Sequence, residues 1–118
     1  MLQDDKDEVY YKSNNDDGND EVKKLVEGTI AHAEELDNII SGYSKSRSVA
    51  RISKLNLAIL RLALYESLYD DNTPVNAAIS EAIALSMTYT YKEDTSFING
   101  VLGAFSRDNK RKEPEENV

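Results

Sequence analysis

The chain contains no cysteine and only one histidine among its 118 residues. Without cysteine it can form neither a disulfide framework nor a thiolate metal site, which fits a reducing cytoplasm. The single histidine, His32, lies in a helical pattern, where a surface position is its ordinary explanation. Metal ligation would need further ligands of suitable type and spacing. We therefore expect no metal site and no cofactor.

Sequence signals for catalysis are also missing. There is no glycine-rich phosphate-binding loop. Glu34 and Glu35 are adjacent on a predicted helix, so their carboxylates diverge and cannot work as an acid–base pair. A catalytic role for His32 would need an orienting carboxylate and a nucleophile in a cleft. We expect a binding protein rather than an enzyme.

Long apolar runs are absent, and none approaches the ~20 residues of a membrane span. The first residues, MLQDDKDEVYY, are acidic and lack the basic flank and apolar stretch of a signal peptide. We expect a cytoplasmic protein without membrane contact. The net charge is -8, so the surface as a whole does not attract nucleic acid, because phosphate contacts need Lys and Arg. Any RNA binding must use a local basic patch.

Apolar side chains at spacings of three and four predict helices over most of the chain. Residues 1–19 are polar and acidic, and we expect them to form a disordered tail. Residues 20–106 form the predicted helical domain, and residues 107–118 a second disordered, charged tail. Within the domain, 20–43 is predicted as one helix, in which a close helix contact could explain Gly28.

Residues 49–69 are predicted as a helix, and from Leu55 to Leu68 the sequence is apolar on nearly all faces, which places this helix at the centre of a bundle. Ser48 or Ser53 could cap its N-terminus. The turn DDNTPV follows, with Thr73 as the predicted cap and Pro74 as the first residue of the next helix. We predict an all-α antiparallel bundle of four to five helices.

Arg61 lies among apolar neighbours on the central helix, where a charge is costly unless it is paired. We predict a structural ion pair with Glu81 on the next helix, and Glu66 is the alternative partner. Direct contact with RNA or with a protein partner is the competing hypothesis for Arg61.

The segment FINGVL allows two interpretations. Asn-Gly between apolar pairs is a hairpin signal, whereas a stripe that continues to Phe105 at helical spacing favours a helix, capped by Asp94 or Thr95. Phe97 would then open the helix directly after a loop. An aromatic side chain there can stack on a splayed base while the helix end attracts phosphate. Packing in the core or at its rim is the ordinary alternative.

A basic stretch lies in and beyond the loop 41–48, with Lys45, Arg47, Arg51 and Lys54. Basic side chains in a loop are usually only solvated, so this stretch by itself is a weak signal of nucleic-acid binding.

Several motifs together resemble the C-terminal half of the NusB family of transcription antitermination factors. The family pattern has Leu-Arg-Leu-Ala and Tyr-Glu on one helix, a Pro turn, Ile-Asn-Glu-Ala, and a final Phe-Val-Asn-Gly-Val-Leu. The matching residues are Leu60–Ala63, Tyr65–Glu66, Pro74, Ile79–Ala82, with Ser80 in place of Asn, and Phe97–Leu102. The resemblance covers roughly residues 20–105 and implies a NusB-like bundle.

The resemblance also implies partners. Family members bind boxA-type RNA together with NusE, a ribosomal protein of the small subunit, in the RNA polymerase antitermination complex. They begin with an Arg-rich segment and a second helix, so we expect an N-terminally truncated member with impaired RNA binding. The family's RNA-contacting Phe matches Phe97, and its acidic loop matches Asp94. The helix around Asn56 to Arg61 resembles part of the NusE-facing surface.

Two other functions stay open. The chain could be a truncated protein-interaction domain without RNA binding, or the NusB-like domain of an rRNA methyltransferase, which needs a catalytic domain after Phe105. The apolar stripe with Leu25, Val26 and Ile30 would be left partly uncovered, which predicts a homodimer or dependence on NusE.

Overall fold

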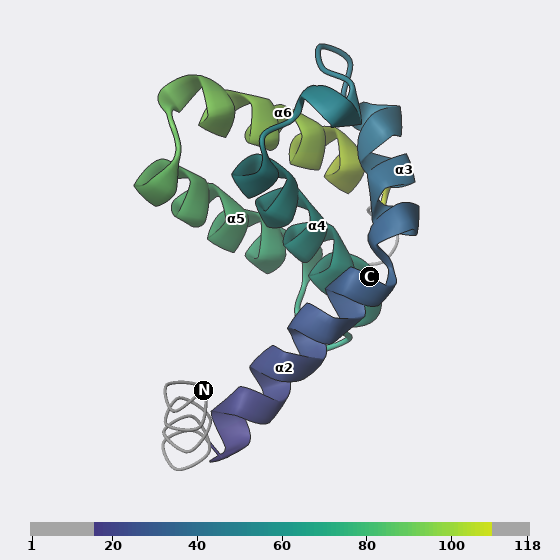
Figure 1. The fold of residues 1–118 in the computed structure, drawn as a ribbon, viewed down its shortest axis with the longest axis vertical. Coiled ribbons are helices and arrows are strands. Elements are labelled where there is room, and N and C mark those ends of the chain that lie inside the picture. The colour runs from purple at the N-terminus through teal and green to yellow at the C-terminus, as the bar shows by residue number, and fades with distance from the viewer. Residues whose placement is uncertain (1–15, 110–118) are drawn as a thin grey trace, which may run out of the picture.

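The structure is a computed structural model, and it describes residues 16–109. This part of the chain contains helices and turns but no strand, so the predicted all-α fold is confirmed. The predicted tails, as far as they cover 1–15 and 110–118, lie outside the described residues. The elements, shown in Figure 1, are α2 (Asp16–Ala31), α3 (Ala33–Tyr43), the 3-10 turn η1 (Val49–Arg51), α4 (Lys54–Tyr69), α5 (Val75–Tyr89) and α6 (Lys92–Asp108).

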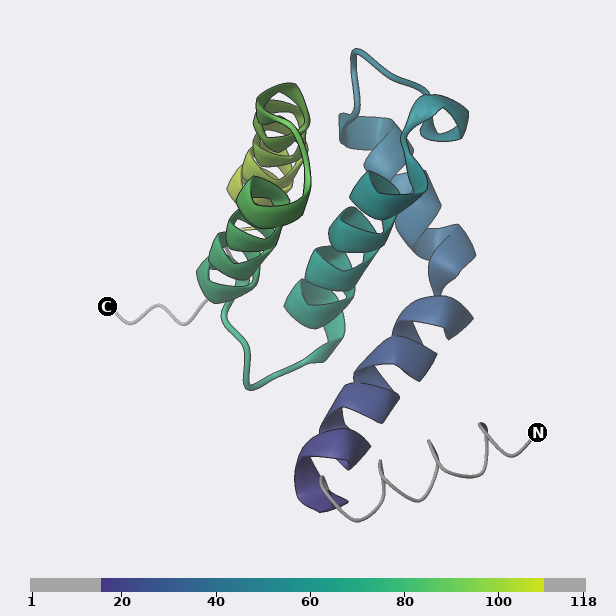
Figure 2. The same cartoon turned by 60° about the vertical axis from the view of Figure 1, so that its left-hand side comes forward.

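Helix α4 lies at the centre of the fold, as its apolar faces predict. It contacts α2, α3, α5 and α6, and α5 and α6 follow it as antiparallel neighbours (Figures 1 and 2). Each large aliphatic side chain buried here stabilises the fold by roughly 1.5–3 kcal/mol. The large apolar side chains that are fully buried are Phe105, Leu36, Ile40, Leu60, Leu64, Ile98 and Leu102. None of the helices within residues 16–109 is long and apolar enough to cross a membrane.

The predicted single helix over 20–43 is wrong in two respects. Residues 16–19, which were assigned to the tail, are already helical, and the helix breaks at His32 into α2 and α3. The backbone of His32 leaves the helical region, with φ -106° and ψ 18°. The bend lets α3 bury Leu36 and Ile40 in the core, while α2 packs against α4 and its N-terminal end projects beyond the bundle (Figure 2). An unbroken stripe of apolar residues gives no sign of this change in direction.

Gly28 has the packing role that the sequence suggested. A Cβ atom at this position would overlap the hydroxyl end of Tyr65 on α4. Only glycine therefore lets α2 approach α4 this closely without displacing the ring.

The helix ends differ from prediction by a few residues. Ser53 caps α4 as proposed, because its side chain accepts a hydrogen bond of 3.1 Å from the Asn56 amide. Pro74, rather than Thr73, is the N-cap residue of α5. Asn99 and Gly100 lie inside α6, so the hairpin alternative is wrong and the helix prediction is confirmed.

Candidate nucleic-acid interface

The connection between α3 and α4 places a basic loop against the first half of α6. The Ser44 hydroxyl donates to the carbonyl of Arg47, and the Arg51 amide donates to the carbonyl of Ser48 over 2.9 Å. These local bonds fix a tight loop with Arg47 near its tip. The loop reaches α6 through the side chain of Arg47, which contacts Asp94 and Phe97.

Arg47 joins the two residues that the sequence singled out for RNA contact. Its guanidinium carbon lies 4.3 Å from the centre of the Phe97 ring, within the range of a cation–π interaction. Its Nη1 atom lies 3.3 Å from Oδ1 of Asp94. The Arg47 and Asp94 side chains keep 31% and 23% of their surface exposed. Asp94 and Phe97 are thus brought together, and Arg47 covers one face of the ring.

Phe97 does not open its helix, contrary to the prediction. Helix α6 begins at Lys92, so Phe97 lies in its second turn. The ring is half-buried and packs against the hydrophobic core. The helix N-terminus and the ring therefore do not form the combined phosphate and base site that the sequence suggested. The Phe97 ring makes its polar contact through the face that the Arg47 guanidinium covers.

The loop and η1 concentrate positive charge on an otherwise acidic protein. Residues 44–54 include four basic residues and no acidic one. Lys45, Arg51 and Lys54 are exposed, and Arg47 is half-buried. Basic side chains around an aromatic ring can neutralise phosphates while the ring stacks on a base.

A group of hydroxyls that sequence reasoning missed holds the start of α6. Ser86 on α5 is fully buried, and its Oγ lies 2.8 Å from Oγ1 of Thr90 and 2.7 Å from Oγ1 of Thr95. These bonds tie the end of α5 to the first turn of α6 and so position Asp94 and Phe97. Ser and Thr at these spacings are common in helices, and no sequence signal distinguishes them.

Asn56 does not lie on a partner-binding surface. Only 1% of its surface is exposed, and neither its Oδ1 nor its Nδ2 has a hydrogen-bond partner in the part of the chain that the structure describes. The predicted contact with NusE through this side chain is therefore wrong. The side chain turns inward because it lies on the same face of α4 as Ile59 and Leu60.

Arg61 forms an ion pair, but not with Glu81 or Glu66. Its Nε and Nη2 atoms each donate to one carboxylate oxygen of Asp37 on α3, both over 2.7 Å. This side of α4 faces α3, because the bend at His32 brings α3 across it. The paired charge was predictable, whereas its partner depends on a rotation that sequence spacing does not give.

Glu81 lies close to Glu66 instead, and the two carboxylates repel each other. Burial, followed by repulsion from Glu81 and Asp70, raises the pKa of the Glu66 carboxyl above its usual range. Within residues 16–109, no group of three or more His, Cys, Asp or Glu side chains is arranged to hold a metal ion.

The fold and this face define a small helical binding protein in which a basic loop lies against the Phe97 ring of α6, an arrangement that suits a nucleic acid. The NusB family model matches residues 1–107. The chain belongs to the NusB family of transcription antitermination factors, which are binding proteins rather than enzymes.

Its relatives include the transcription antitermination protein NusB of Thermoanaerobacter sp. (strain X514), 40% identical over 93% of this chain and 79% of the relative. NusB of Acetivibrio thermocellus is 43% identical over 75% of this chain and 61% of the relative. NusB of Caldicellulosiruptor saccharolyticus is 36% identical over 78% of this chain and 70% of the relative. These relatives favour antitermination over the methyltransferase hypothesis. No solved structure gives a significant match.

Proposed function

We propose that this protein binds boxA-type RNA through the face formed by Arg47, Phe97 and the neighbouring basic residues. In this role it acts with NusE in the antitermination complex of RNA polymerase in the cytoplasm. The observation that carries the proposal is the position of Arg47, which lies over Phe97 and is held there by Asp94.

The arrangement suits RNA because each contact of Arg47 has a counterpart in an RNA strand. A phosphate can replace the Asp94 carboxylate as the partner of Arg47, since both are anions that accept charge-assisted hydrogen bonds. Once Arg47 turns to the phosphate, the ring of Phe97 is free to stack on a base. Asp94 therefore stabilises the RNA-free position of Arg47 and opposes RNA binding.

A titration of labelled boxA-type RNA at two salt concentrations tests this proposal. Four basic residues lie between residues 44 and 54. If each contacts one phosphate of a single strand, log K falls with log salt with a slope of about -3. A slope near zero, or binding that is unaffected by changing Arg47 and Arg51 to Ala, would contradict the proposal.

The apolar groove between α2, α3 and α4 is the proposed protein-binding surface. Val26 and Ile30 on its edge are 46% and 69% exposed, and Ala58 and Leu62 form the facing wall. Its polar groups are already bonded, because the Thr29 hydroxyl donates to the Leu25 carbonyl over 2.7 Å and Arg61 is paired with Asp37. NusE binds here, and without NusE a second copy of the chain covers the same groove.

Sedimentation across a concentration series tests this surface. We expect self-association that weakens when Ile30 is changed to Ser and that NusE suppresses. The matched control is Met87→Ser, because Met87 is also 69% exposed but lies on α5 outside the groove. A monomer at all concentrations that also fails to bind NusE would contradict the proposal.

A further inference from the structure

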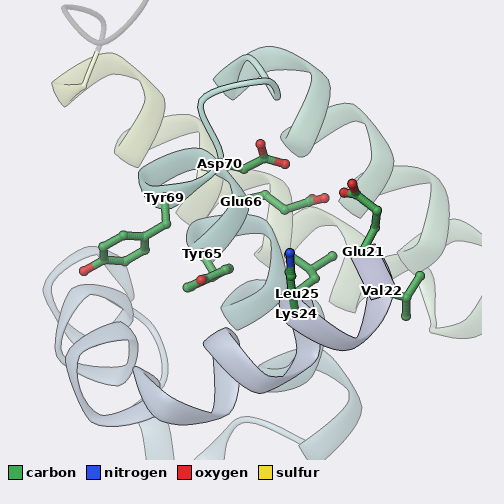
Figure 3. A pocket seen from close by; sticks show the side chains of 8 residues that line it. All are labelled: Glu21, Val22, Lys24, Leu25, Tyr65, Glu66, Tyr69 and Asp70. Atoms are coloured by element: carbon green, nitrogen blue, oxygen red, sulfur yellow. The ribbon is translucent and has the colours of Figure 1, made fainter. Parts of the chain in front are cut away.

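A second groove runs between α2 and the C-terminal half of α4, at the opposite end of α4 from the basic loop. It has a volume of about 380 Å³. Figure 3 shows Tyr65 and Tyr69 along one side, while Glu21 and Glu66 extend into the groove from α2 and α4. The two rings come from α4 and the carboxylates from α2 and α4, so aromatic and acidic groups line the same groove, with the Tyr69 ring pointing away from Glu21 and Glu66 (Figure 3).

The aromatic wall is rigidly held. The ring centres of Tyr65 and Tyr69 are 5.0 Å apart, and the His32 ring lies 4.5 Å from that of Tyr69. The Tyr69 hydroxyl donates its single proton to the Glu35 carboxylate, whose two oxygens lie 2.7 and 2.8 Å away. The close approach at Gly28 fixes Tyr65 against α2. These contacts hold the two rings in place, and Tyr69 nevertheless stays 44% exposed, so its ring is accessible to a ligand.

The carboxylates of the groove are not neutralised within the described residues. Glu21, Glu66 and Asp70 line it with Lys24 as the single base, and none of the three forms an ion pair in the part of the chain from 16 to 109. The carboxylate of Asp70 accepts bonds from the Asn72 amide and the Thr73 hydroxyl. Glu21 and Glu66 therefore carry charge that an incoming cation can pair with.

We propose that this groove binds an arginine-bearing segment of a basic protein partner. The planar guanidinium stacks on the tyrosine rings and donates hydrogen bonds to Glu66 and Glu21, a combination that suits arginine better than lysine. RNA is excluded from this end because its phosphates would meet the same carboxylates. The surface is separate from the apolar groove and from the basic loop.

The electrostatic state of Glu66 supports this inference. Burial and the neighbouring Glu81 and Asp70 raise the pKa of the Glu66 carboxyl. A cation in the groove relieves the repulsion among these carboxylates. Because the free protein already carries this repulsion, its relief makes the free energy of binding more favourable.

The test uses the full chain labelled with ¹⁵N and a capped peptide of alternating glycine and arginine. We expect the peptide to shift the amide signals of Glu21, Tyr65, Glu66 and Tyr69. The double substitution Glu21→Gln with Glu66→Gln should weaken binding at least fivefold. A peptide with lysine in place of arginine should bind more weakly than the arginine peptide.

The control is Glu34→Gln with Glu93→Gln, which removes the same total charge from exposed positions outside the groove. It should leave peptide affinity within twofold of the unchanged protein. Equal weakening by both double variants, equal affinity for the lysine peptide, or signal shifts confined to the basic loop would overturn the proposal. Peptide binding only after Lys110, Arg111 and Lys112 are changed to Ala would show that the chain's own basic stretch is the occupant, which would also overturn it.

Discussion

Two arginine–aspartate pairs in this protein have similar exposure but different geometry. The side chains of Arg47 and Asp94 are 31% and 23% exposed, and those of Arg61 and Asp37 are 30% and 27% exposed. Arg61 makes two bonds of 2.7 Å to Asp37, whereas Arg47 makes one contact of 3.3 Å to Asp94. Geometry rather than burial therefore separates the two pairs.

The difference corresponds to two tasks. The bidentate Arg61–Asp37 pair joins α4 to α3 and raises the pKa of Arg61 through its hydrogen bond with Asp37, so it holds the bundle together. Arg47 is shared between a carboxylate and the face of Phe97, and neither contact is strong. A pair that must open for a ligand needs this weaker arrangement.

The largest expected effect is on stability. Changing Arg61 to Ala should lower the free energy of unfolding by about 2–3 kcal/mol, because hydrogen bonds to a charged group are lost and Asp37 is left half-buried without its partner. Urea denaturation followed by circular dichroism measures this. Arg47→Ala is the matched comparison and should cost less than about 1 kcal/mol. Equal losses would remove the distinction between the two pairs.

Asn56 extends the comparison to a polar side chain that has no partner at all within the described residues. Changing it to Leu should raise the free energy of unfolding by about 1 kcal/mol, because an unsatisfied buried amide is costly. The same denaturation experiment applies. A loss of stability would show that the amide finds partners in solution.

These cases show how much of the molecule the sequence predicts. The all-α bundle, the central position of α4, the Ser53 cap and the reason for Gly28 follow from periodicity and residue type, which are local properties. The partner of Arg61 and the inward side of Asn56 depend on how each helix is rotated about its axis. That rotation is set by the bend at His32 and by the packing of α3, which no local pattern encodes.

The candidate interface was predictable to the same extent. Phe97 was singled out by its position and by the resemblance to the NusB family, Asp94 by that resemblance alone, and the basic stretch gave Arg47 as one of four candidates. Their mutual contact could not be predicted, because it joins a loop before α4 to a helix that begins some forty residues later. The hydroxyls of Ser86 and Thr95 that support it were missed for the same reason.

A smaller effect, on RNA affinity, is expected from the weaker pair of Arg47 and Asp94. Changing Asp94 to Asn should raise affinity for boxA-type RNA about threefold to tenfold, because it removes repulsion toward phosphate and frees Arg47. Fluorescence anisotropy at fixed salt measures the change. Glu93→Gln removes the same charge from an exposed neighbour and should have less effect. An identical gain in both variants would show that only net charge matters and that the Arg47 contact does not.

The most direct test of the proposed RNA face is the affinity of the Phe97→Leu variant for boxA-type RNA. Leucine keeps the packing against the core but cannot stack on a base. The binding free energy should therefore weaken by about 1–2 kcal/mol, which lowers the affinity roughly fivefold to thirtyfold. The melting temperature should change little. Met87→Leu, at an exposed site on α5, serves as the control. Unchanged RNA affinity in a folded Phe97→Leu protein would contradict the account, because the ring would then be a core residue only.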